Sequence, residues 1–468
     1  MKYLINTLGC AMNYSDSERV AALLEKLGYE KTSEVADTDL YIFNTCSIRQ
    51  KGEDRVYGQL NNLERLKKSN PRLLVGITGC MVRSTSSRNS EKETKDEIIK
   101  KIDAVDFVFR ITDSHKIGEV LEEAEPQLDL PQLEEAGLST DLKGQTAYLA
   151  IKPKYGSKFQ AFVPIQIGCD KYCTYCIVPY ARGREQSRPM ADIIAECRAL
   201  VENGCKEITL VGQTVNSYGL SITDKKTGGF EGIADPFVKL LTEIDHLQEL
   251  GLNRVRFTSP HPRDYTDALI EAHATLKTLT PHFHLPVQAG DDEVLRRMNR
   301  QYTVEKYRGI INRIRARVPN ASITTDIIVG FCGETDEQFE RTVALFAEIR
   351  WDMAYLSRYS PRPGTTSVKV FVDDVPRSVK ASRWHTLNSL LEKCSSEYNQ
   401  KMVGRTFEIL VEKFDEATGE CEGKSRENKV VQFPGNQNLV GSIVEVKVTK
   451  AIQWNVKGEL LGRKNSLL

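Results

Sequence analysis

The chain has 468 residues, of which 40% are hydrophobic, and its 64 Lys and Arg balance 64 Asp and Glu. This length is enough for two or three domains, and the zero net charge argues against a polycation that coats nucleic acid nonspecifically, although local basic patches remain compatible with RNA binding. No apolar run reaches the roughly 18 residues of a membrane span, and residues 1–6 read as a strand and not as a signal peptide. We therefore expect a cytoplasmic protein without membrane association. Its eleven cysteines should stay reduced there, so metal binding explains them better than disulfide bonds do.

The first part of the chain, residues 1–120, alternates strands and helices. The apolar patterns predict strands over 2–8, 40–43 and 73–77, and helices over 15–27 and 51–68. Strands separated by helices predict a parallel α/β domain. Residues 121–144 are interpreted as an acidic linker, because 121–141 hold seven acidic residues, two prolines and no basic residue, which is typical of a solvated tether.

The alternation resumes in residues 145–400. Six strands are predicted near 162–167, 207–211, 254–258, 283–287, 324–329 and 354–359. Helical patterns lie between most of them, which favours a partial (β/α)6 barrel related to the TIM fold. After a helix over 378–401, residues 401–465 show short strands at 406–412, 430–433, 442–449 and 459–461. They predict a small all-β barrel, open like those that bind oligonucleotides.

The sharpest motif is Cys169-x3-Cys173-x2-Cys176, directly after the first barrel strand. Three thiolates at this spacing can hold three corners of a [4Fe–4S] cube and leave one iron open to an external ligand, which suits catalysis better than electron storage. The alternatives are a zinc site or a buried cysteine cluster. Zinc sites usually pair Cys-x2-Cys with a second such pair downstream, and this sequence has no second pair.

A second set of cysteines, Cys10, Cys46 and Cys80, is dispersed in sequence but alike in context, since each follows a predicted strand. The carboxyl ends of parallel strands line one edge of a sheet, so these three thiols can converge on a second [4Fe–4S] cluster. The small neighbours Gly9 and Gly79 leave room for it. The alternative is three unrelated, half-buried cysteines. The other five cysteines show no such pattern and are interpreted as structural: Cys197, Cys205, Cys332, Cys394 and Cys421.

With Tyr175 before its last cysteine, the first motif resembles the radical S-adenosylmethionine (SAM) superfamily. The whole chain resembles the methylthiotransferases, which combine an N-terminal methylthiotransferase domain, a radical SAM core and a C-terminal TRAM domain. The segments that carry the resemblance lie at 8–13, 44–49, 173–180, 182–183, 187–189 and 284–288. Two positions depart from the family pattern: Cys332 stands where proline is common, and Ala289 where serine is usual.

The resemblance implies that SAM chelates the open iron and is cleaved to methionine and a 5′-deoxyadenosyl radical. Two SAM molecules are used: one methylates a sulfur associated with the N-terminal cluster, and the other yields the radical that removes a hydrogen from an adenine ring carbon. The segments favour the branch that adds a methylthio group to C2 of N6-(dimethylallyl)adenosine at position 37 of tRNA, next to the anticodon. The implied partners are a tRNA anticodon stem-loop, a donor such as flavodoxin or ferredoxin, and an iron–sulfur cluster carrier; a monomer is expected.

Polar residues after the barrel strands are candidate SAM ligands, because ligands of this fold bind at that face. Several could instead only form turns, and His261 is interpreted as local structure. The candidate SAM-binding residues are Tyr175, Gln213, Asn216, Ser259, Gln288 and Val329.

For RNA, the sequence offers basic side chains and aromatic rings. One helix face could neutralise phosphates through Arg296, Arg297, Arg300, Lys306, Arg308, Arg313, Arg315 and Arg317. Phe407, Phe433 and Trp454 could stack on unpaired bases or fill the barrel core.

Three other functions remain open. The same chemistry could act on threonylcarbamoyladenosine in tRNA or on an aspartate of a ribosomal protein. The clusters could only sense iron or redox state in an RNA-binding protein. A radical SAM methyltransferase without sulfur transfer is the third, although the N-terminal cysteines weigh against it.

Overall fold

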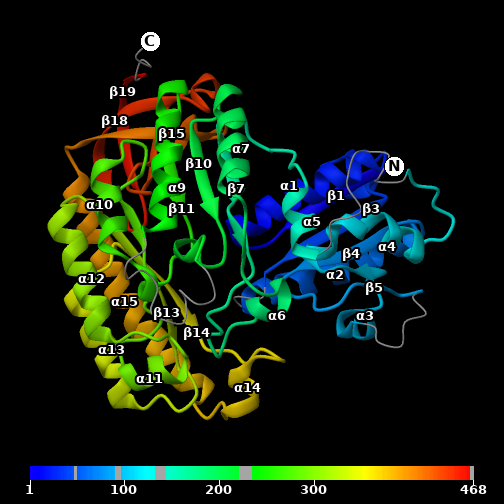
Figure 1. Ribbon diagram of the computed structural model, residues 1–468, viewed down its shortest axis with the longest axis horizontal. Helices are drawn as coiled ribbons and strands as arrows, with labels where there is room; N and C mark the ends of the chain where they lie inside the picture. Colours follow the sequence, from blue (N-terminus) through cyan, green and yellow to red (C-terminus); the bar gives the residue numbers. More distant parts are fainter. Residues whose placement is uncertain (47–49, 90–95, 132–143, 221–233, 464–468) are drawn as a thin grey trace.

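The N-terminal domain is a six-stranded sheet covered by helices (Figure 1, blue to cyan). A computed structural model describes residues 1–46, 50–89, 96–131, 144–220 and 234–463. The strand order is β2-β1-β3-β4-β6-β5, and only the β5–β6 pair is antiparallel. Central strand β3 (Leu40–Thr45) is buried along its whole length, as expected for a parallel strand covered on both faces. The other elements are β1 (Lys2–Thr7), α1 (Ala11–Lys26), β2 (Glu30–Lys31), η1 (Val35–Asp37), α2 (Gln50–Ser69), β4 (Leu74–Gly79), β5 (Ser86–Ser87), α3 (Glu97–Lys101), β6 (Phe107–Val108) and η2 (Ile111–Lys116).

The predicted acidic linker begins inside a helix. α4 (Ile117–Ala124) buries Leu121 against the N-terminal core, and α5 (Gly144–Ala150) adds the fully buried Tyr148 to that core. The acidic pattern misled the prediction because the glutamates of α4 occupy its solvent side, while its apolar residues recur at helical spacing on the other. Residues 132–143 of the predicted linker lie outside the described residues.

The central domain is a curved sheet of six parallel strands, which confirms the predicted partial barrel. Two three-stranded sheets, β11-β10-β7 and β12-β13-β14, are joined by a bridge between Val255 and Leu279. The strands are β7 (Gln160–Pro164), β10 (Glu207–Val211), β11 (Arg254–Phe257), β12 (His282–His284), β13 (Ser322–Val329) and β14 (Met353–Arg358). The helices are α6 (Val178–Arg182), α7 (Met190–Glu202), α9 (Pro236–Asp245), α10 (Asp267–Thr275), α11 (Asp292–Arg297), α12 (Val304–Arg317), α13 (Asp336–Ile349), α14 (Thr366–Val370) and α15 (Arg377–Met402). Shorter pieces are β8 (Gln166–Ile167), β9 (Gln186–Ser187), η3 (Val215–Ser217), η4 (His246–Leu250) and η5 (Pro262–Asp264).

The C-terminal module is a closed five-stranded barrel of order β15-β16-β17-β19-β18, where the sequence predicted an open one. Strand β16 (Glu420–Ser425) was not predicted, because its inward positions hold only Cys421, Gly423 and Ser425, which give no apolar run. The other elements are β15 (Thr406–Asp415), β17 (Val430–Pro434), η6 (Gln437–Leu439), β18 (Ile443–Ala451) and β19 (Val456–Arg463).

The barrel docks at the amino ends of the core strands (Figure 1, orange to red, above β10 and β11). Arg254 donates to the carbonyl oxygens of Lys424 at 2.7 Å and Glu408 at 2.9 Å, and Arg256 donates to that of Ser425 at 2.7 Å. The carboxyl ends of the core strands therefore stay clear of the barrel. In the described part of the chain, no helix is long and apolar enough to cross a membrane.

Candidate functional site

The loop of the Cys169–Cys176 motif connects β8 to α6. Gly168 enters it with φ of 79°, and a Cβ atom there would overlap the carbonyl oxygen of Arg184. The Cys169 Sγ lies 3.2 Å from the Thr214 Oγ1, and the Cys176 amide donates to the Cys173 carbonyl at 2.9 Å. A single tight loop thus carries all three thiols at the carboxyl end of the first core strand.

The segment after α11 holds this loop from the opposite side. Asn299 Nδ2 donates to the carbonyl oxygens of Lys171 at 3.2 Å and Tyr172 at 3.0 Å, and Thr174 N donates to Met298 O at 3.1 Å. Arg300 is buried, and its Nη1 donates to the Cys173 Sγ at 3.3 Å.

Arg300 corrects one sequence prediction. It was grouped with the basic residues of a surface face, but it points inward to the cysteine loop, since Asn299 and Gln301 on either side have positive φ values of 58° and 57° and reverse the local chain. A second buried cation, Lys171, pairs with Asp264. Cations beside the loop suit a cluster held by three thiolates.

Burial raises the pKa of two of the loop thiols in the metal-free chain, Cys169 and Cys176. It raises the pKa of Cys169 to about 11, with a further rise from Cys173. The pKa of Cys176 is raised by burial, then by Cys173 and Cys169, and also by Cys80 of the N-terminal domain. Metal binding therefore has to displace the protons of Cys169 and Cys176.

The N-terminal cysteines meet at neighbouring strand ends. Cys10 is the N-cap of α1, Cys46 follows β3, and Cys80 follows β4. A Cβ atom on Gly9 would lie 2.8 Å from the Cys46 Cβ, so these two strand ends touch. The pKa of Cys10 is raised first by the loss of water around its thiol and then by Cys80, although the residue keeps an exposed side.

Asn13 ties these ends together, and the sequence analysis did not single it out. Its Nδ2 donates to the Asn44 Oδ1 at 2.8 Å and to the Thr45 carbonyl at 3.0 Å, while its Oδ1 accepts from the Cys10 Sγ at 3.2 Å. Asn13 follows Cys10 by three residues, which places both side chains on the same face of the helix, and this spacing could have indicated the contact.

Each set supplies three cysteines, the donors that iron–sulfur clusters require. Within the described ranges, no three His, Cys, Asp or Glu side chains are arranged to hold a single metal ion. A cube presents its irons at separate corners, so its cysteines stand further apart than the ligands of one ion. The donor chemistry of both sets is thus the kind that a [4Fe–4S] cluster requires.

The candidate SAM residues lie where the core strands end. Ser259 and Gln288 have positive φ values of 58° and 70°, a conformation that is uncommon for non-glycine residues and is enriched at functional sites. The Gln213 Oε1 is buried and has no hydrogen-bond partner among the described residues, so it is open to a polar ligand. Val329 is fully buried at the end of β13, and the Tyr175 ring packs edge-on against Phe331.

Asn216 differs from the other candidates. Its Nδ2 donates to the His261 carbonyl at 3.0 Å, and its Oδ1 accepts from the His261 amide at 2.8 Å. The side chain thus joins the second and third strand ends. His261 Nδ1 in turn accepts from the Arg263 amide and caps η5, which matches the local structural role predicted for it.

The five remaining cysteines are buried. Cys332 lies in the core cluster, and its carbonyl accepts from Arg297 Nη1 at 2.6 Å. This bond uses only the backbone of Cys332, so it does not require the proline that is common in the family.

The predicted basic face is largely neutralised. Arg308 pairs with Glu305 and Glu348, Arg313 with Asp267, and Arg317 with Glu271. Arg296 likewise pairs with Glu293.

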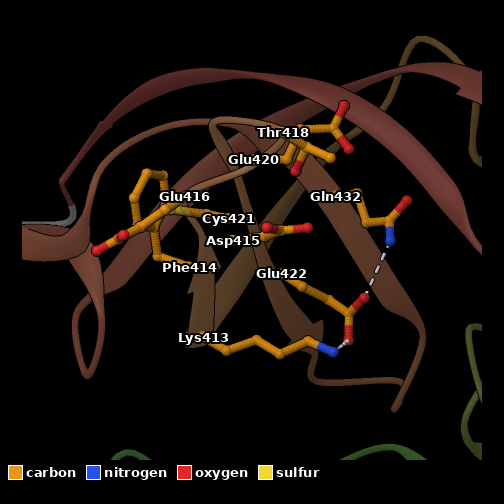
Figure 2. A pocket seen from close by; sticks show the side chains of 9 residues that line it. All are labelled: Lys413, Phe414, Asp415, Glu416, Thr418, Glu420, Cys421, Glu422 and Gln432. Carbon is orange, nitrogen blue, oxygen red and sulfur yellow. Dashed lines mark hydrogen bonds and ion pairs between the residues drawn. The ribbon is translucent and has the colours of Figure 1, made fainter.

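The barrel offers one aromatic ring to RNA. Phe407 and Phe433 are buried in its core, whereas Trp454, between β18 and β19, is 39% exposed. At the β15–β16 end, a hollow is lined by four carboxylates and one lysine, so its lining is acidic and disfavours phosphate: Asp415, Glu416, Glu420, Glu422 and Lys413 (Figure 2).

Two exposed tyrosines lie in or beside the cysteine loop, a third lies on α1, and none of them was proposed as an RNA contact from the sequence. Tyr172 in the loop is 41% exposed, Tyr180 on α6 is 37% exposed, and Tyr14 on α1 is 50% exposed. Exposed rings beside a reaction site are suited to stacking on splayed-out bases. Tyr172 and Tyr180 lie inside or beside the cysteine motif, which was the available signal.

Three family profiles match the chain: the radical SAM superfamily over residues 163–346, Uncharacterized protein family UPF0004 over residues 2–109, and the TRAM domain over residues 400–461. Among solved structures, the radical S-adenosylmethionine methyltransferase TsrM from Kitasatospora setae is similar with a TM-score of 0.52 and 13% identity, covering 76% of this chain and 72% of that one. At this identity, the likeness supports the fold alone.

Relatives named tRNA-2-methylthio-N(6)-dimethylallyladenosine synthase match nearly the whole chain. The protein from Bacillus subtilis (strain 168) is 41% identical over 98% of this chain and 86% of its own length. That from Thermoanaerobacter sp. (strain X514) is 40% identical over 98% of this chain and 92% of its own length. With the radical SAM cysteine loop and the C-terminal barrel in place, the chain belongs to the tRNA methylthiotransferase family of radical SAM enzymes.

Proposed function

We propose that this protein adds a methylthio group to C2 of N6-(dimethylallyl)adenosine at position 37 of tRNA. The observation that carries the proposal is that the two cysteine triplets lie on domains packed against each other: Ser15 Oγ on α1 donates to the Phe162 carbonyl at 3.3 Å, and Arg182 Nη2 donates to the Asp16 Oδ2 at 2.5 Å. Relatives about 40% identical over the whole chain bear the name of this reaction. Replacement of C–H by C–SCH3 needs a sulfur site close to a radical site, and two triplets on domains that pack together suit such a pair.

In this proposal, Cys169, Cys173 and Cys176 bind one [4Fe–4S] cluster and leave an iron for SAM, while Cys10, Cys46 and Cys80 bind a second. When bound, the first cluster and SAM supply a one-electron route for removing hydrogen from an unactivated ring carbon. Two SAM molecules are consumed per product, one as the methyl donor.

The chain's own residues hold SAM and protect the site. The buried Gln213 Oε1 is a free acceptor for a polar group of SAM, and the strained backbone at Ser259 and Gln288 presents polar side chains at the strand ends. Val329 and Tyr175 provide apolar contacts, Asn216 fixes the loop of His261, and Arg300 donates to Cys173.

The tRNA anticodon stem-loop is proposed to contact both the tyrosines around the cysteine loop and the barrel. Trp454 is the exposed barrel ring suited to stacking. We further infer a monomer acting in the cytoplasm, where tRNA is found, with flavodoxin or ferredoxin as electron donor and a carrier protein as the source of clusters.

The test begins with tRNA nucleosides from a deletion strain. The strain should lack 2-methylthio-N6-(dimethylallyl)adenosine, and the intact gene should restore it. Unchanged nucleoside, or loss of a methylthiolated threonylcarbamoyladenosine instead, would refute the substrate assignment.

Cysteine variants test the second cluster. Anaerobically reconstituted protein should hold about eight irons per chain. A Cys10→Ala, Cys46→Ala and Cys80→Ala triple variant should hold about four, cleave SAM and form no product. Cys197→Ala, which removes a buried thiol far from both motifs, serves as the control and should retain both clusters. A triple variant that still forms full product would overturn the two-cluster proposal.

A further inference from the structure

Helix α1 begins at Cys10 and buries polar residues against the radical SAM core. Ser15, Asp16 and Arg19 are all fully buried. Ser15 Oγ donates to the carbonyl oxygen of Phe162 in β7 at 3.3 Å. The helix that carries one cysteine of the N-terminal triplet is thus packed directly on the strand that leads to the other triplet (α1 beside β7 in Figure 1).

The centre of this contact is an ion pair shut off from water. Arg182 Nη2 donates to the Asp16 Oδ2 at 2.5 Å, and its Nη1 to the Oδ1 at 3.3 Å. Tyr148 OH donates to the same Oδ1 at 2.5 Å. All three side chains are fully buried. The Asp16 carboxylate therefore accepts three hydrogen bonds, two from the Arg182 guanidinium and one from the Tyr148 hydroxyl, out of contact with water.

Both members of the pair lie close in sequence to a cysteine triplet. Asp16 lies six residues after Cys10 on α1, and Arg182 lies six residues after Cys176 on α6.

Stability alone does not account for this arrangement. Burying both charges costs much of what their attraction returns, and apolar residues of the same volume often stabilise a protein as well or better. Two forked hydrogen bonds and a tyrosine instead permit only one relative position of α1 and α6.

We propose that Asp16 and Arg182, with Tyr148, are positioning residues that set the separation of the two cluster sites, so that the sulfur to be transferred stands within reach of the adenosine carbon. The inference rests on the proposed function. A misplacement of about 1 Å can cost roughly 100-fold in a reaction between positioned groups. Radical formation needs only the core site, so a shift between the domains should affect transfer and spare SAM cleavage.

The test compares Asp16→Asn with the parent protein and with Lys154→Met. Lys154 forms an exposed pair with Glu25 across the same two domains, 2.6 Å between Nζ and Oε1, and is the matched control. The readouts are iron content, 5′-deoxyadenosine formed, methylthiolated tRNA formed, and the spin–spin interaction between the two reduced clusters by electron paramagnetic resonance.

For Asp16→Asn, we expect unchanged iron, SAM cleavage within about twofold of the parent, at least about tenfold less product, and a weaker or broadened spin–spin interaction. Lys154→Met should match the parent in all four. If cleavage and product fall in parallel, or if the spin–spin interaction is unchanged, the positioning role is refuted.

A milder variant covers the case in which Asp16→Asn does not fold. Tyr148→Phe removes one hydrogen bond and keeps the ring, and it should raise the ratio of 5′-deoxyadenosine to product in the same direction. An unchanged ratio would refute the role of the tyrosine-held carboxylate. Absence of methylthiolated tRNA from the parent itself would refute the proposed function instead, while the spin–spin readout would still decide whether the pair sets the separation.

Discussion

At the scale of single residues, the cysteine loop depends on one glycine. Gly168 has a left-handed backbone, and the Arg184 carbonyl oxygen lies where a Cβ atom would be. Any other residue at this position would therefore be strained for two reasons. We expect Gly168→Ala to displace the loop and to abolish binding of the core cluster, measured as about four irons per chain in place of about eight.

Gly204 is the matched control for that change. It has φ of 93°, but no atom lies within 4 Å of an added Cβ among the described residues. Gly204→Ala should therefore carry only the backbone cost, about 1 kcal/mol, and keep both clusters. Equal cluster loss in both variants would mean that backbone strain, and not the clash with Arg184, decides the outcome.

The sequence predicts a residue's role where close spacing places several side chains on one loop, as for Cys169, Cys173 and Cys176. Two contacts were not predictable, because they depend on which segments meet in space: the hydrogen bond from Arg300 to the Cys173 Sγ and the one from Asn216 to the His261 carbonyl. A charged residue in a basic run has no local mark that tells burial from exposure.

At the scale of elements, the barrel presents Trp454 on the turn between β18 and β19. The turn is fixed, because Asn399 Nδ2 on α15 donates to the Ile452 carbonyl at 2.6 Å, so the exposed ring costs little entropy on binding. Trp454→Ala should weaken tRNA binding by about 1 to 3 kcal/mol, measured by filter binding at fixed salt.

Arg317→Ala is the companion measurement. Because Arg317 already pairs with Glu271 at 2.6 Å, we expect tRNA affinity and its salt dependence to change little. A larger loss for Arg317→Ala than for Trp454→Ala would place the RNA on α12 instead of the barrel.

Most elements of the fold were predictable because their periodicity is strong, as for β10 and β13. Strand β16 and helix α4 were not, for opposite reasons. In β16 the partners on both sides, β15 and β17, make the strand despite its weak apolar content. In α4 the buried apolar residues Ile117, Val120, Leu121 and Ala124 bind the helix to the core, but its three glutamates run on into an acidic stretch that is typical of a tether.

At the scale of the whole molecule, buried charges join the barrel to the core. Glu207 accepts from Arg256 Nε at 3.0 Å, and Arg254 lies 3.8 Å away. Burial alone would raise the pKa of Glu207, but Arg256 and then Arg254 hold it below its usual 4.5. The stabilisation is therefore present at neutral pH and is lost as the pH falls below about 4.5 towards the folded-state pKa.

Glu207→Gln should lower the free energy of unfolding by about 3 to 5 kcal/mol at pH 7, because it leaves buried arginines without their carboxylate. The deficit should shrink as the pH falls below 4.5, measured by denaturant unfolding at several pH values. Glu293→Gln, on an exposed pair with Arg296, should show no such deficit. A deficit that is constant with pH would contradict the role of ionised Glu207.

The barrel and the cysteine loop lie at opposite ends of the same strands. Strands β10 and β11 alone separate these ends by roughly 13 to 17 Å. An RNA that touches both must run along the outside of the core. Such an RNA is therefore selected by its length as well as by its chemistry. A nucleoside or a very short hairpin reaches only one end, and discrimination among substrates then depends on how far a folded RNA extends and not only on its modified base.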